Sequence, residues 1–548
     1  MYTYEEFSDQ QIQILSRYVT NTDSNVFAIF NLPEVIKGAL FSKYSRSTLG
    51  LRSLLLKEFI LNEATCFSSI TQNSLSHSTD EVGQKEEQFI AIKKAQNFYD
   101  RILDGYGDDS IGELGGAHLA IENVSMLAAK ILEDSRIGGS PLEKSTRYIY
   151  FDQKVNGEYM FYREPILMAS AYRDIYIKTC HLLFETYSNL IPPLTEMIGK
   201  KFPQEPGVSQ VAYTAALRAK VLDCLRGLLP ASTLTNMGVY GNGRFFETLI
   251  QKLNNHSLAE MQNIGGKAHQ ELSKVIPSFV RRGDLSHKHQ KSFSAYLDHI
   301  NHQIAKISKE FDSHPSNKNT EAVSLIDYDK EAPLKVASSI LFNKTNVSLK
   351  QIQESLKGSS DNRIEEILNA AASGRQNRRH KSPRGLEHAS FTFEIMADFG
   401  IYRDLQRHRL LTQDRQLLSC DFGYYIPPEI QNTEWEAPYC EALEEAKKAY
   451  DIISLEFPEE VQYIVPMAYN IRWYFHINLR SLQWLCELRS SAAGHPGYRY
   501  IAQEMARQVC QVFPCFEVFF QFVDYEGHDL GRLEQESRKI AKMSKNEN

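Results

Sequence analysis

The sequence predicts an α/β protein built from two related domains, and three observations lead to this fold class. The chain has 548 residues, which is more than a single hydrophobic core usually organises. Two separate blocks of sequence recur further along the chain in the same order. Within these blocks, a strand-like alternation of apolar residues leads into apolar residues at helical spacing.

The first repeated block is "GELGGAHLAIENVSMLAAKIL" (112–132), which is similar to "LEHASFTFEIMADFGIYRDLQ" (386–406). The offset from Glu113 to Glu387 is 274 residues. In both copies the glutamate precedes alternating apolar residues, as in a strand with one buried face, and then apolar residues at helical spacing. The block therefore predicts one strand followed by one helix in each half.

The second block is "GLLPASTLTNMGVYGNGRFFETLIQKL" (227–253), which is similar to "QYIVPMAYNIRWYFHINLRSLQWLCELR" (462–489). From Pro230 to Pro466 the offset is 236 residues, and the Asn-x-Arg triplets "NGR" and "NLR" match at the same offset. Two ordered matches predict a duplicated chain. The alternative is that two unrelated α/β domains share the same succession of strands and helices by chance.

Composition shifts place the domain boundaries. The Ser-, Pro- and Asn-rich stretch 311–322 is typical of a linker. It separates a first domain over 1–310 from a second domain over 323–548, and 69–87 is a polar insertion in the first.

Charge and composition exclude several classes of protein. Hydrophobic residues make up 42% and charged residues 24%, with a formal net charge of −7, so the chain is not a polycation that coats nucleic acid. No apolar run of about 18 residues and no basic leader occur. The eight cysteines form no CxxC pair, which suits reduced thiols. We therefore expect a cytoplasmic protein that binds neither membrane nor nucleic acid.

An Arg-His-Arg triplet in "RDLQRHRLLTQDRQLLSCDF" (403–422) directly follows a predicted amphipathic helix. Three adjacent basic groups repel one another, so a bound anion is expected to offset them. Alone, such a triplet is more often a solvated helix end, where cations interact with the helix dipole. The surrounding motifs decide between these interpretations.

The second half carries, in order, "LEHASFTFEI", "QRHR", "INLRSLQWLCELR" and "AQEMARQ". In these motifs it resembles the flavin-dependent thymidylate synthases. The first half resembles a diverged copy, with "GDDSIGELG", "LEKSTRY" and "GNGR". The resemblance covers about half of the chain and implies domains that each contain a twisted, mainly antiparallel sheet packed with helices.

The resemblance also implies a function. The family methylates deoxyuridine monophosphate (dUMP) to thymidylate, with methylenetetrahydrofolate as carbon donor, NADPH as reductant and FAD as cofactor. Arginine suits such chemistry because its planar fork matches phosphate oxygens. By resemblance, the catalytic residues are Ser145, Arg407 and Arg489. The dUMP-binding residues are Glu143, Ser145, Arg147, Arg226, Gln406, Arg407 and Arg489. The FAD-binding residues are Glu387, Arg407, His408, Arg409 and Asn478.

The two halves depart from the family in complementary ways. The family's Glu-x-Ser-x-Arg loop is kept in the first half as "EKSTR" (143–147) but reads "LLSCD" (417–421) in the second. Conversely, the Arg-His-Arg triplet is absent from the first half. This pattern predicts a composite site with one face from each half. A reciprocal site would place Glu133 and Asp421 against the phosphate, each costing roughly 4 kcal/mol at about 4 Å, and should be inactive.

Assembly and alternatives follow from the same comparison. The resemblance implies that each active site is built by several subunits, as in the family's homotetramer. Because this chain carries two copies of the domain, it is expected to form a homodimer that reproduces the tetramer's arrangement. The alternative function is a catalytically silent nucleotide- or flavin-binding relative.

Two other basic or metal-like stretches are weaker candidates. The run "GRQNRRHKSPRG" (374–385) is expected to be a flexible exposed loop that needs no ligand, although it could steer anionic substrates. His287, His289, His299 and His302 lack the Cys or carboxylate pattern of a zinc site, so no metal is expected.

Overall fold

The computed structural model describes residues 6–44, 47–60, 112–134, 137–311 and 321–546. The predicted insertion at 69–87 and most of the predicted linker lie outside these residues, so the predicted domain boundaries stay a prediction. The chain forms two compact units, each drawn from several stretches of sequence. Unit 1 comprises 1–121, 137–142 and 237–314, and unit 2 comprises 122–136, 143–236 and 315–548.

Unit 1 contains short N-terminal helices and a group of helices that follow strand β5. The helices and helical turns are α1 (Asp9–Leu15), α2 (Glu34–Tyr44), α3 (Leu51–Leu54), η1 (Leu55–Ile60), α10 (Gly243–Asn254), α11 (Ala259–Leu272), α12 (Pro277–Val280), η5 (Arg281–Gly283) and α13 (Lys288–Ser308). A three-stranded sheet has the order β1 (Gly116–Ser125), β5 (Leu234–Asn242), β2 (Gly139–Glu143). Each of these strands begins in one unit and ends in the other.

Unit 2 is built on a four-stranded sheet in which every neighbouring pair is antiparallel. Its order is β6 (Val323–Tyr328), β7 (Ser390–Asp398), β9 (Asn470–Asn478), β8 (Thr412–Arg415). Phe391, Phe393 and Ile395 alternate along β7 and are all fully buried, which confirms the buried strand face predicted for the second half. In the first half, Leu119 and Ile121 alternate along β1 but are only half-buried, so the fully buried face predicted there is wrong. The antiparallel sheet packed with helices confirms the predicted fold class.

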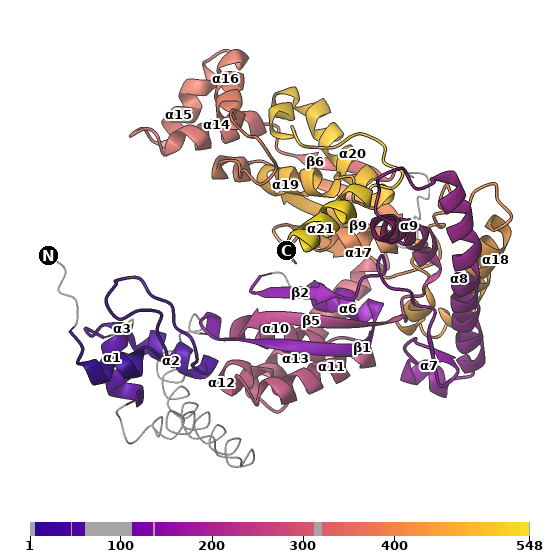
Figure 1. The fold of residues 1–548 in the computed structure, drawn as a ribbon, viewed down its shortest axis with the longest axis horizontal. Helices are drawn as coiled ribbons and strands as arrows, with labels where there is room; N and C mark the ends of the chain where they lie inside the picture. The colour runs from indigo at the N-terminus through magenta and orange to yellow at the C-terminus, as the bar shows by residue number, and fades with distance from the viewer. Residues whose placement is uncertain (1–5, 45–46, 61–111, 135–136, 312–320, 547–548) are drawn as a thin grey trace. The chain divides into compact units, whose positions relative to one another are not determined.

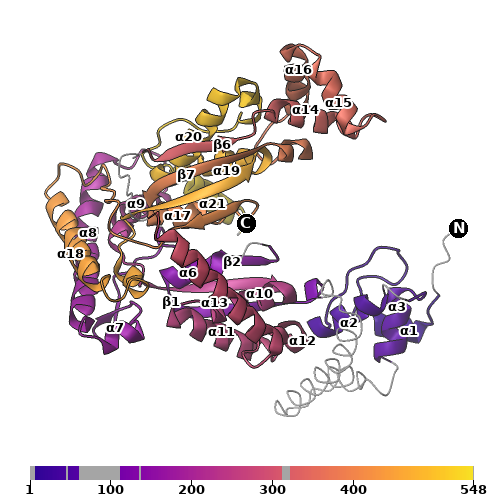
Figure 2. The same cartoon turned by 180° about the vertical axis from the view of Figure 1, so that it is seen from behind.

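Helices of unit 2 come from both halves of the chain. From the first half come α6 (Met126–Glu133), α7 (Pro165–Ala169), α8 (Arg173–Lys201), α9 (Gln210–Leu225), η4 (Arg226–Leu228) and the hairpin β3 (Lys154–Val155) with β4 (Glu158–Tyr159). From the second half come α14 (Ala332–Phe342), α15 (Leu349–Lys357), α16 (Asp361–Ala372), η6 (Arg384–His388), α17 (Phe399–Leu405), α18 (Glu436–Ile453), η7 (Glu460–Ile464), α19 (Leu479–Arg489), α20 (Pro496–Val512), η8 (Pro514–Phe519) and α21 (Leu533–Asn546). The long helix α8 runs beside α18, and α17 lies beside β7 and β9 (Figures 1 and 2).

The repeated blocks adopt matching elements in the two halves. Strands β5 and β9 begin and end 236 residues apart, and the strand orders β1-β5-β2 and β7-β9-β8 correspond. Asn242 and Asn478 cap the helices that follow, each side chain accepting a hydrogen bond from the backbone three residues on. Such caps satisfy helix N–H groups that lack an intrahelical partner, so they fix where each helix starts.

Backbone hydrogen bonds around Pro230 and Pro466 are reciprocal within unit 2. Ala231 N donates to Val465 O at 2.9 Å, and Met467 N donates to Leu229 O at 2.9 Å. Leu229 matches Val465 and Ala231 matches Met467 at the 236-residue offset. The two hydrogen bonds are therefore the same bond made once in each direction between the halves. The prolines themselves form an antiparallel bridge, so the matched segments of the two halves pair directly.

No helix among the described residues is long and apolar enough to cross a membrane. Likewise, nowhere in the described ranges do three or more His, Cys, Asp or Glu side chains gather to hold a metal. The seven described cysteines are free thiols.

Candidate active site

Glu143, from the first half of the chain, is the centre of a buried ion-pair network in unit 2. Its Oε2 accepts hydrogen bonds from Lys130 Nζ at 2.8 Å and from Arg407 Nη2 at 3.2 Å. Its Oε1 accepts from Arg403 Nη2 at 2.6 Å. Burial alone would raise the pKa of Glu143, but the nearby positive charges, Arg403 first, outweigh burial and lower it to about 2. The carboxylate therefore stays ionised at neutral pH.

Glu133 belongs to the same network. Lys130 Nζ donates a hydrogen bond to Glu133 Oε2, and Arg407 Nε lies 3.7 Å from Glu133 Oε1. Burial would lower the pKa of Arg407, but the carboxylates of Glu133, Asp404 and Glu143 raise it. Glu133, which the sequence assigns to the reciprocal, inactive site, thus contacts Arg407 of the predicted nucleotide site.

Gln406 joins the two halves through α6. It follows the last residue of α17, and its Nε2 donates to the carbonyl of Lys130 at 2.8 Å. Its Oε1 is buried without a hydrogen-bond partner among the described residues. An unpaired buried acceptor is costly unless a ligand or water satisfies it, so Gln406 retains one atom for a ligand.

Arg147 is held by two residues of unit 2. Its Nε and Nη2 each donate to an oxygen of Asp223 at 2.5 Å, and its Nη1 donates to Tyr498 Oη at 3.1 Å. Burial would raise the pKa of Asp223, but the charge of Arg147 lowers it to about 2. Ser145 Oγ accepts a hydrogen bond from Arg147 N at 3.2 Å, which fixes the loop that carries both residues.

Asp404 interacts electrostatically with all four arginines that are predicted to bind the nucleotide. Arg226 Nη1 donates to its Oδ2 at 2.9 Å. Burial would raise the pKa of Asp404, but four positive charges hold it far below its usual range. Those charges belong to Arg226, Arg407, Arg147 and Arg489. Arg147 and Arg226 belong to the first half of the chain, and Arg407 and Arg489 belong to the second. The Asp404 carboxylate therefore interacts with positive charges from both faces of the predicted site.

We call the connected charged groups the composite cluster. It comprises Lys130, Glu133, Glu143, Arg147, Asp223, Arg226, Arg403, Asp404, Arg407 and Arg489. Within this set, six basic side chains meet four carboxylates. The basic side chains of this set therefore outnumber its carboxylates, which favours an anionic ligand.

His408 connects the composite cluster to a pocket beside α19. Arg489 Nε donates to His408 Nε2 at 2.9 Å. Burial and the charge of Arg489 hold the pKa of His408 well below its usual value. The imidazole is therefore neutral, and because Nε2 accepts, the proton sits on Nδ1.

The pocket beside α19, here the α19 pocket, has a volume of about 670 Å³. All five residues predicted to bind FAD line it: Glu387, Arg407, His408, Arg409 and Asn478. Arg480 Nη1 donates to Glu387 Oε1 at 2.7 Å. Its volume lies within the range of about 300–1,000 Å³ that is usual for small-molecule and cofactor sites.

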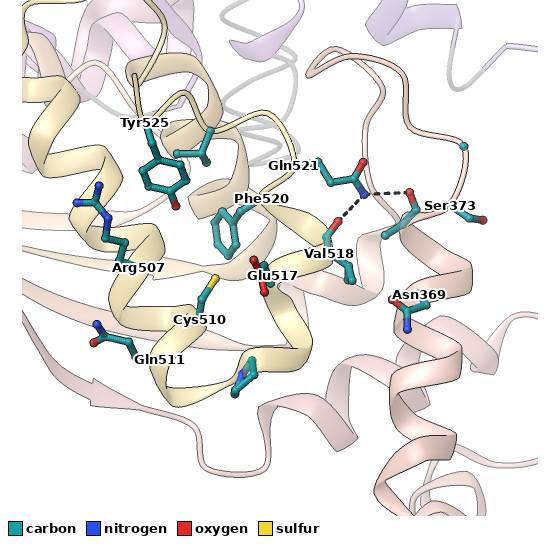
Figure 3. A pocket seen from close by; sticks show the side chains of 14 residues that line it. Asn369, Ser373, Arg507, Cys510, Gln511, Glu517, Val518, Phe520, Gln521 and Tyr525 are labelled. Carbon is teal, nitrogen blue, oxygen red and sulfur yellow. Dashed lines mark hydrogen bonds between the residues drawn. The ribbon is translucent and has the colours of Figure 1, made fainter. Parts of the chain in front are cut away.

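A further pocket, of about 950 Å³, is lined by residues of α16, α20 and η8 and by the segment after η8. Figure 3 shows Arg507, Cys510 and Tyr525 on one side of it and Gln521 on the other, where the Gln521 amide donates to Val518 O at 2.6 Å. None of the predicted nucleotide or flavin residues lines this pocket.

Sequence reasoning missed the partners of the predicted arginines. Arg403 and Asp404 stand just before "QRHR", separated from it by Leu405 alone, and Asp223 precedes Arg226 by three residues. Their placement beside recognised residues was the available signal. Lys130 and Tyr498 carried no signal in the sequence that distinguishes them from core residues.

The fold defines an α/β protein whose second unit holds a buried cluster of charged groups in which basic side chains outnumber carboxylates. A family model described as "Thymidylate synthase complementing protein" matches residues 60–278 and 324–515. The chain therefore belongs to this family, and the predicted family resemblance is confirmed.

Several relatives support this membership. A UPF0159 protein of Chlamydia muridarum is 54% identical over 98% of this chain and 99% of its own. A UPF0159 protein of Thermoplasma acidophilum is 32% identical over 92% of this chain and 99% of its own. A flavin-dependent thymidylate synthase of Clostridium tetani is 29% identical over 35% of this chain and 83% of its own.

Among solved structures, the UMP/dUMP methylase PolB from Streptomyces cacaoi, bound with 5-Br dUMP, is similar. Its TM-score is 0.29 at 16% sequence identity, and the match covers 37% of this chain and 95% of that chain.

Proposed function

We propose that the protein is a flavin-dependent thymidylate synthase that methylates dUMP reductively, with methylenetetrahydrofolate as carbon donor and NADPH as reductant. Family membership supports the reaction class. The observation that carries the proposal is the buried ion-pair network that joins the two halves of the chain: Arg226 pairs with Asp404, Arg407 pairs with Glu143, and the charges of Arg147 and Arg489 also act on Asp404. These are the four arginines that the sequence assigns to the nucleotide.

In this proposal the composite cluster binds the phosphate of dUMP. Because its basic side chains outnumber its carboxylates, it would attract a phosphate dianion. The unpaired Oε1 of Gln406 would accept a hydrogen bond from the nucleotide, and Ser145 would donate its hydroxyl proton to it. Carboxylate partners hold the guanidinium groups in place before the ligand arrives, which lowers the entropy cost of binding.

The α19 pocket fits the proposed FAD. Its lining offers several cations for a diphosphate, and the neutral His408 can donate from Nδ1. When bound, the flavin would carry the hydride from NADPH to the pyrimidine. The protein's own contribution is to hold Glu387, Arg409 and Asn478 around the pocket and to keep the imidazole in one protonation state.

We further propose that the chain arose by tandem duplication and works as a homodimer. The matching strand orders and the reciprocal bonds around Pro230 and Pro466 support duplication. In this view the two copies diverged so that each half keeps one face of the site.

A second candidate is a catalytically silent nucleotide-binding relative. The observation that favours it is that Arg147, Arg226 and Arg407 already have carboxylate partners in the chain. A phosphate would then compete with internal anions.

One experiment separates the two candidates. The purified full chain is supplied with FAD, dUMP and methylenetetrahydrofolate, and NADPH oxidation and thymidylate formation are followed. The proposed enzyme oxidises NADPH and forms thymidylate only when dUMP is present. Nucleotide binding without thymidylate would support the silent relative and overturn the proposed reaction.

A further inference from the structure

Helix α13 of unit 1 is exposed along most of its length. Of its 21 residues only Gln290 is buried, and every residue over 301–310 is exposed. In Figure 2 no other helix or strand of unit 1 lies in front of α13. Most of the stability of a helix in a protein comes from packing of an apolar face. A long helix with so little packing therefore directs attention to its apolar residues.

The apolar residues of α13 follow a heptad repeat. Six of them recur at alternating intervals of four and three residues: Phe293, Leu297, Ile300, Ile304, Ile307 and Phe311. The last lies three residues past the end of the helix. This alternation has a mean period of 3.5 residues, which is the repeat of a coiled coil, and the six residues occupy its d and a positions in turn. We call these six residues the α13 seam.

The seam is uncovered toward its C-terminal end. Ile304, Ile307 and Phe311 are 59%, 57% and 75% exposed, whereas the three seam residues before them are half-buried. Single exposed apolar residues are common on protein surfaces, but neighbouring ones on one helix face mark an interaction site. The C-terminal part of the seam therefore has the character of an interface.

The positions that flank the seam suit pairing with an identical helix. In a coiled coil these are the e and g positions, where charges select the partner and like charges oppose self-pairing. Here the e positions are Ser294, Asn301 and Ser308, and the g positions are Tyr296, Gln303 and Glu310. Only one of the six is charged, so two copies of α13 can meet without rows of like charges.

The width of the seam argues against a membrane surface as its occupant. A helix that lies on a membrane has a broad apolar face and a polar face rich in lysine or arginine. The seam is a narrow stripe of two residues in seven, and the rest of α13 carries Asp298 and four histidines besides its lysines. A narrow stripe instead matches the seam of a second helix.

We propose that the α13 seam is an interface between two copies of this chain, in which the two α13 helices pair as a short coiled coil. A two-fold axis brings the same surface of both copies together, so each seam meets an identical one. The helix lies outside the residues that the family model matches, 60–278 and 324–515. The inference assigns an interface to the homodimer proposed above, and it does not depend on the proposed reaction.

The test measures the mass of the full chain in solution by light scattering over a range of concentrations. We expect the wild type to give twice the mass of one chain. The combined change Ile304→Glu and Ile307→Glu should raise the dissociation constant at least about a hundredfold, because it replaces four apolar side chains per dimer with charges of like sign. Glutamate is a good helix former, so α13 itself should persist.

Ala295→Glu combined with Ala305→Glu is the matched control. Both alanines are exposed on α13 and lie outside the seam and its flanking positions, and the two changes add the same charge to the same helix. This control should dissociate like the wild type. Equal dissociation constants for the seam variant and the control would overturn the seam as interface, and a dimer that persists in both would leave the homodimer itself standing.

Hydrogen exchange on the wild type makes the test independent of how the variants fold. The amides of α13 should exchange more slowly at concentrations where the chain is dimeric than after dilution to the monomer. Exchange that stays the same while the dimer dissociates would place the interface elsewhere. A chain that is monomeric throughout would overturn both the interface and the homodimer, and its sedimentation with vesicles of anionic phospholipid would identify a membrane as the occupant. Thymidylate formation is assayed separately, so failure of the proposed reaction leaves these outcomes unaffected.

Discussion

Glu143 accepts a hydrogen bond from Arg407 at 3.2 Å, although 264 residues separate them in the sequence. The same carboxylate also pairs with Arg403 of the second half. Removing one partner of a buried ion pair leaves an uncompensated charge, at a cost of about 3–5 kcal/mol. The two halves of the chain are therefore coupled through these ion pairs, because either half alone would contain buried charges without a partner.

Arg407→Ala tests the nucleotide role most cleanly. The Arg407 side chain is 40% exposed, and Glu143 keeps Lys130 and Arg403 as partners, so the fold should persist. We expect dUMP affinity to fall by roughly 1.5–3 kcal/mol, the range for a charge-assisted hydrogen bond. Isothermal titration with dUMP measures this loss. Arg363→Ala, at an exposed ion pair, is the control, and equal affinities for the two variants would remove Arg407 from the site.

Glu133→Gln should act in the opposite direction. Glu133 places a buried negative charge within 3.7 Å of Arg407, so it competes with a phosphate for that guanidinium. Removing the charge while keeping the shape should strengthen dUMP binding several-fold. The same titration applies, with the exposed Glu205→Gln as a control. An affinity that does not change would show that Glu133 does not compete with the phosphate for Arg407.

The elements around the site could be predicted because local sequence determines them. The alternating apolar residues of β7 and the capping asparagines of α10 and α19 are visible in the sequence, and they lie where the structure has them. Only the family resemblance, together with the loss of different motifs from the two halves, predicted that Arg147 and Arg407 belong to one site. Tertiary packing brings them near Asp404.

The carboxylate partners could not be predicted. Asp223 lies in α9, where an aspartate normally faces solvent, and only the approach of Arg147 makes its burial tolerable. Likewise, Arg375 pairs with Glu487, 112 positions away, and this contact anchors the loop 374–385, so the expectation of a flexible exposed loop is wrong. Such long-range pairs leave no periodic pattern in a single sequence.

Gly227→Ala should destabilise the paired segments of the two halves. A Cβ on Gly227 would lie 2.4 Å from Tyr439 Oη and 3.0 Å from Ala468 Cβ. Tyr439 is fully buried, so the clash can be relieved only by moving packed groups, at a cost of roughly 1–3 kcal/mol. Urea unfolding measures the loss. Gly238→Ala is the control, because its Cβ would meet nothing within 4 Å. Equal stabilities would mean that Tyr439 can move aside freely.

Asp398→Asn should change how stability depends on pH. Asp398 caps α17 by accepting a hydrogen bond from Ile401 N at 2.9 Å, and asparagine can cap in the same way. Burial raises the pKa of Asp398 to about 6, although the charge of Arg226 opposes the rise. In the unfolded chain an aspartate titrates near pH 3.9.

Between about pH 4 and pH 6 the folded wild-type protein therefore binds more protons than the unfolded chain. Its stability must fall as pH rises through this window, by up to about 3 kcal/mol from this group. Asparagine does not titrate, so the melting temperature of Asp398→Asn relative to the wild type should rise from about pH 4 to pH 6 and then level off. Contributions of Glu143 and Asp223, whose pKa values lie near 2, are common to both proteins and cancel in the difference. Thermal melts across the window measure it, and a difference that stays constant or shrinks would show that Asp398 is ionised in the folded protein throughout.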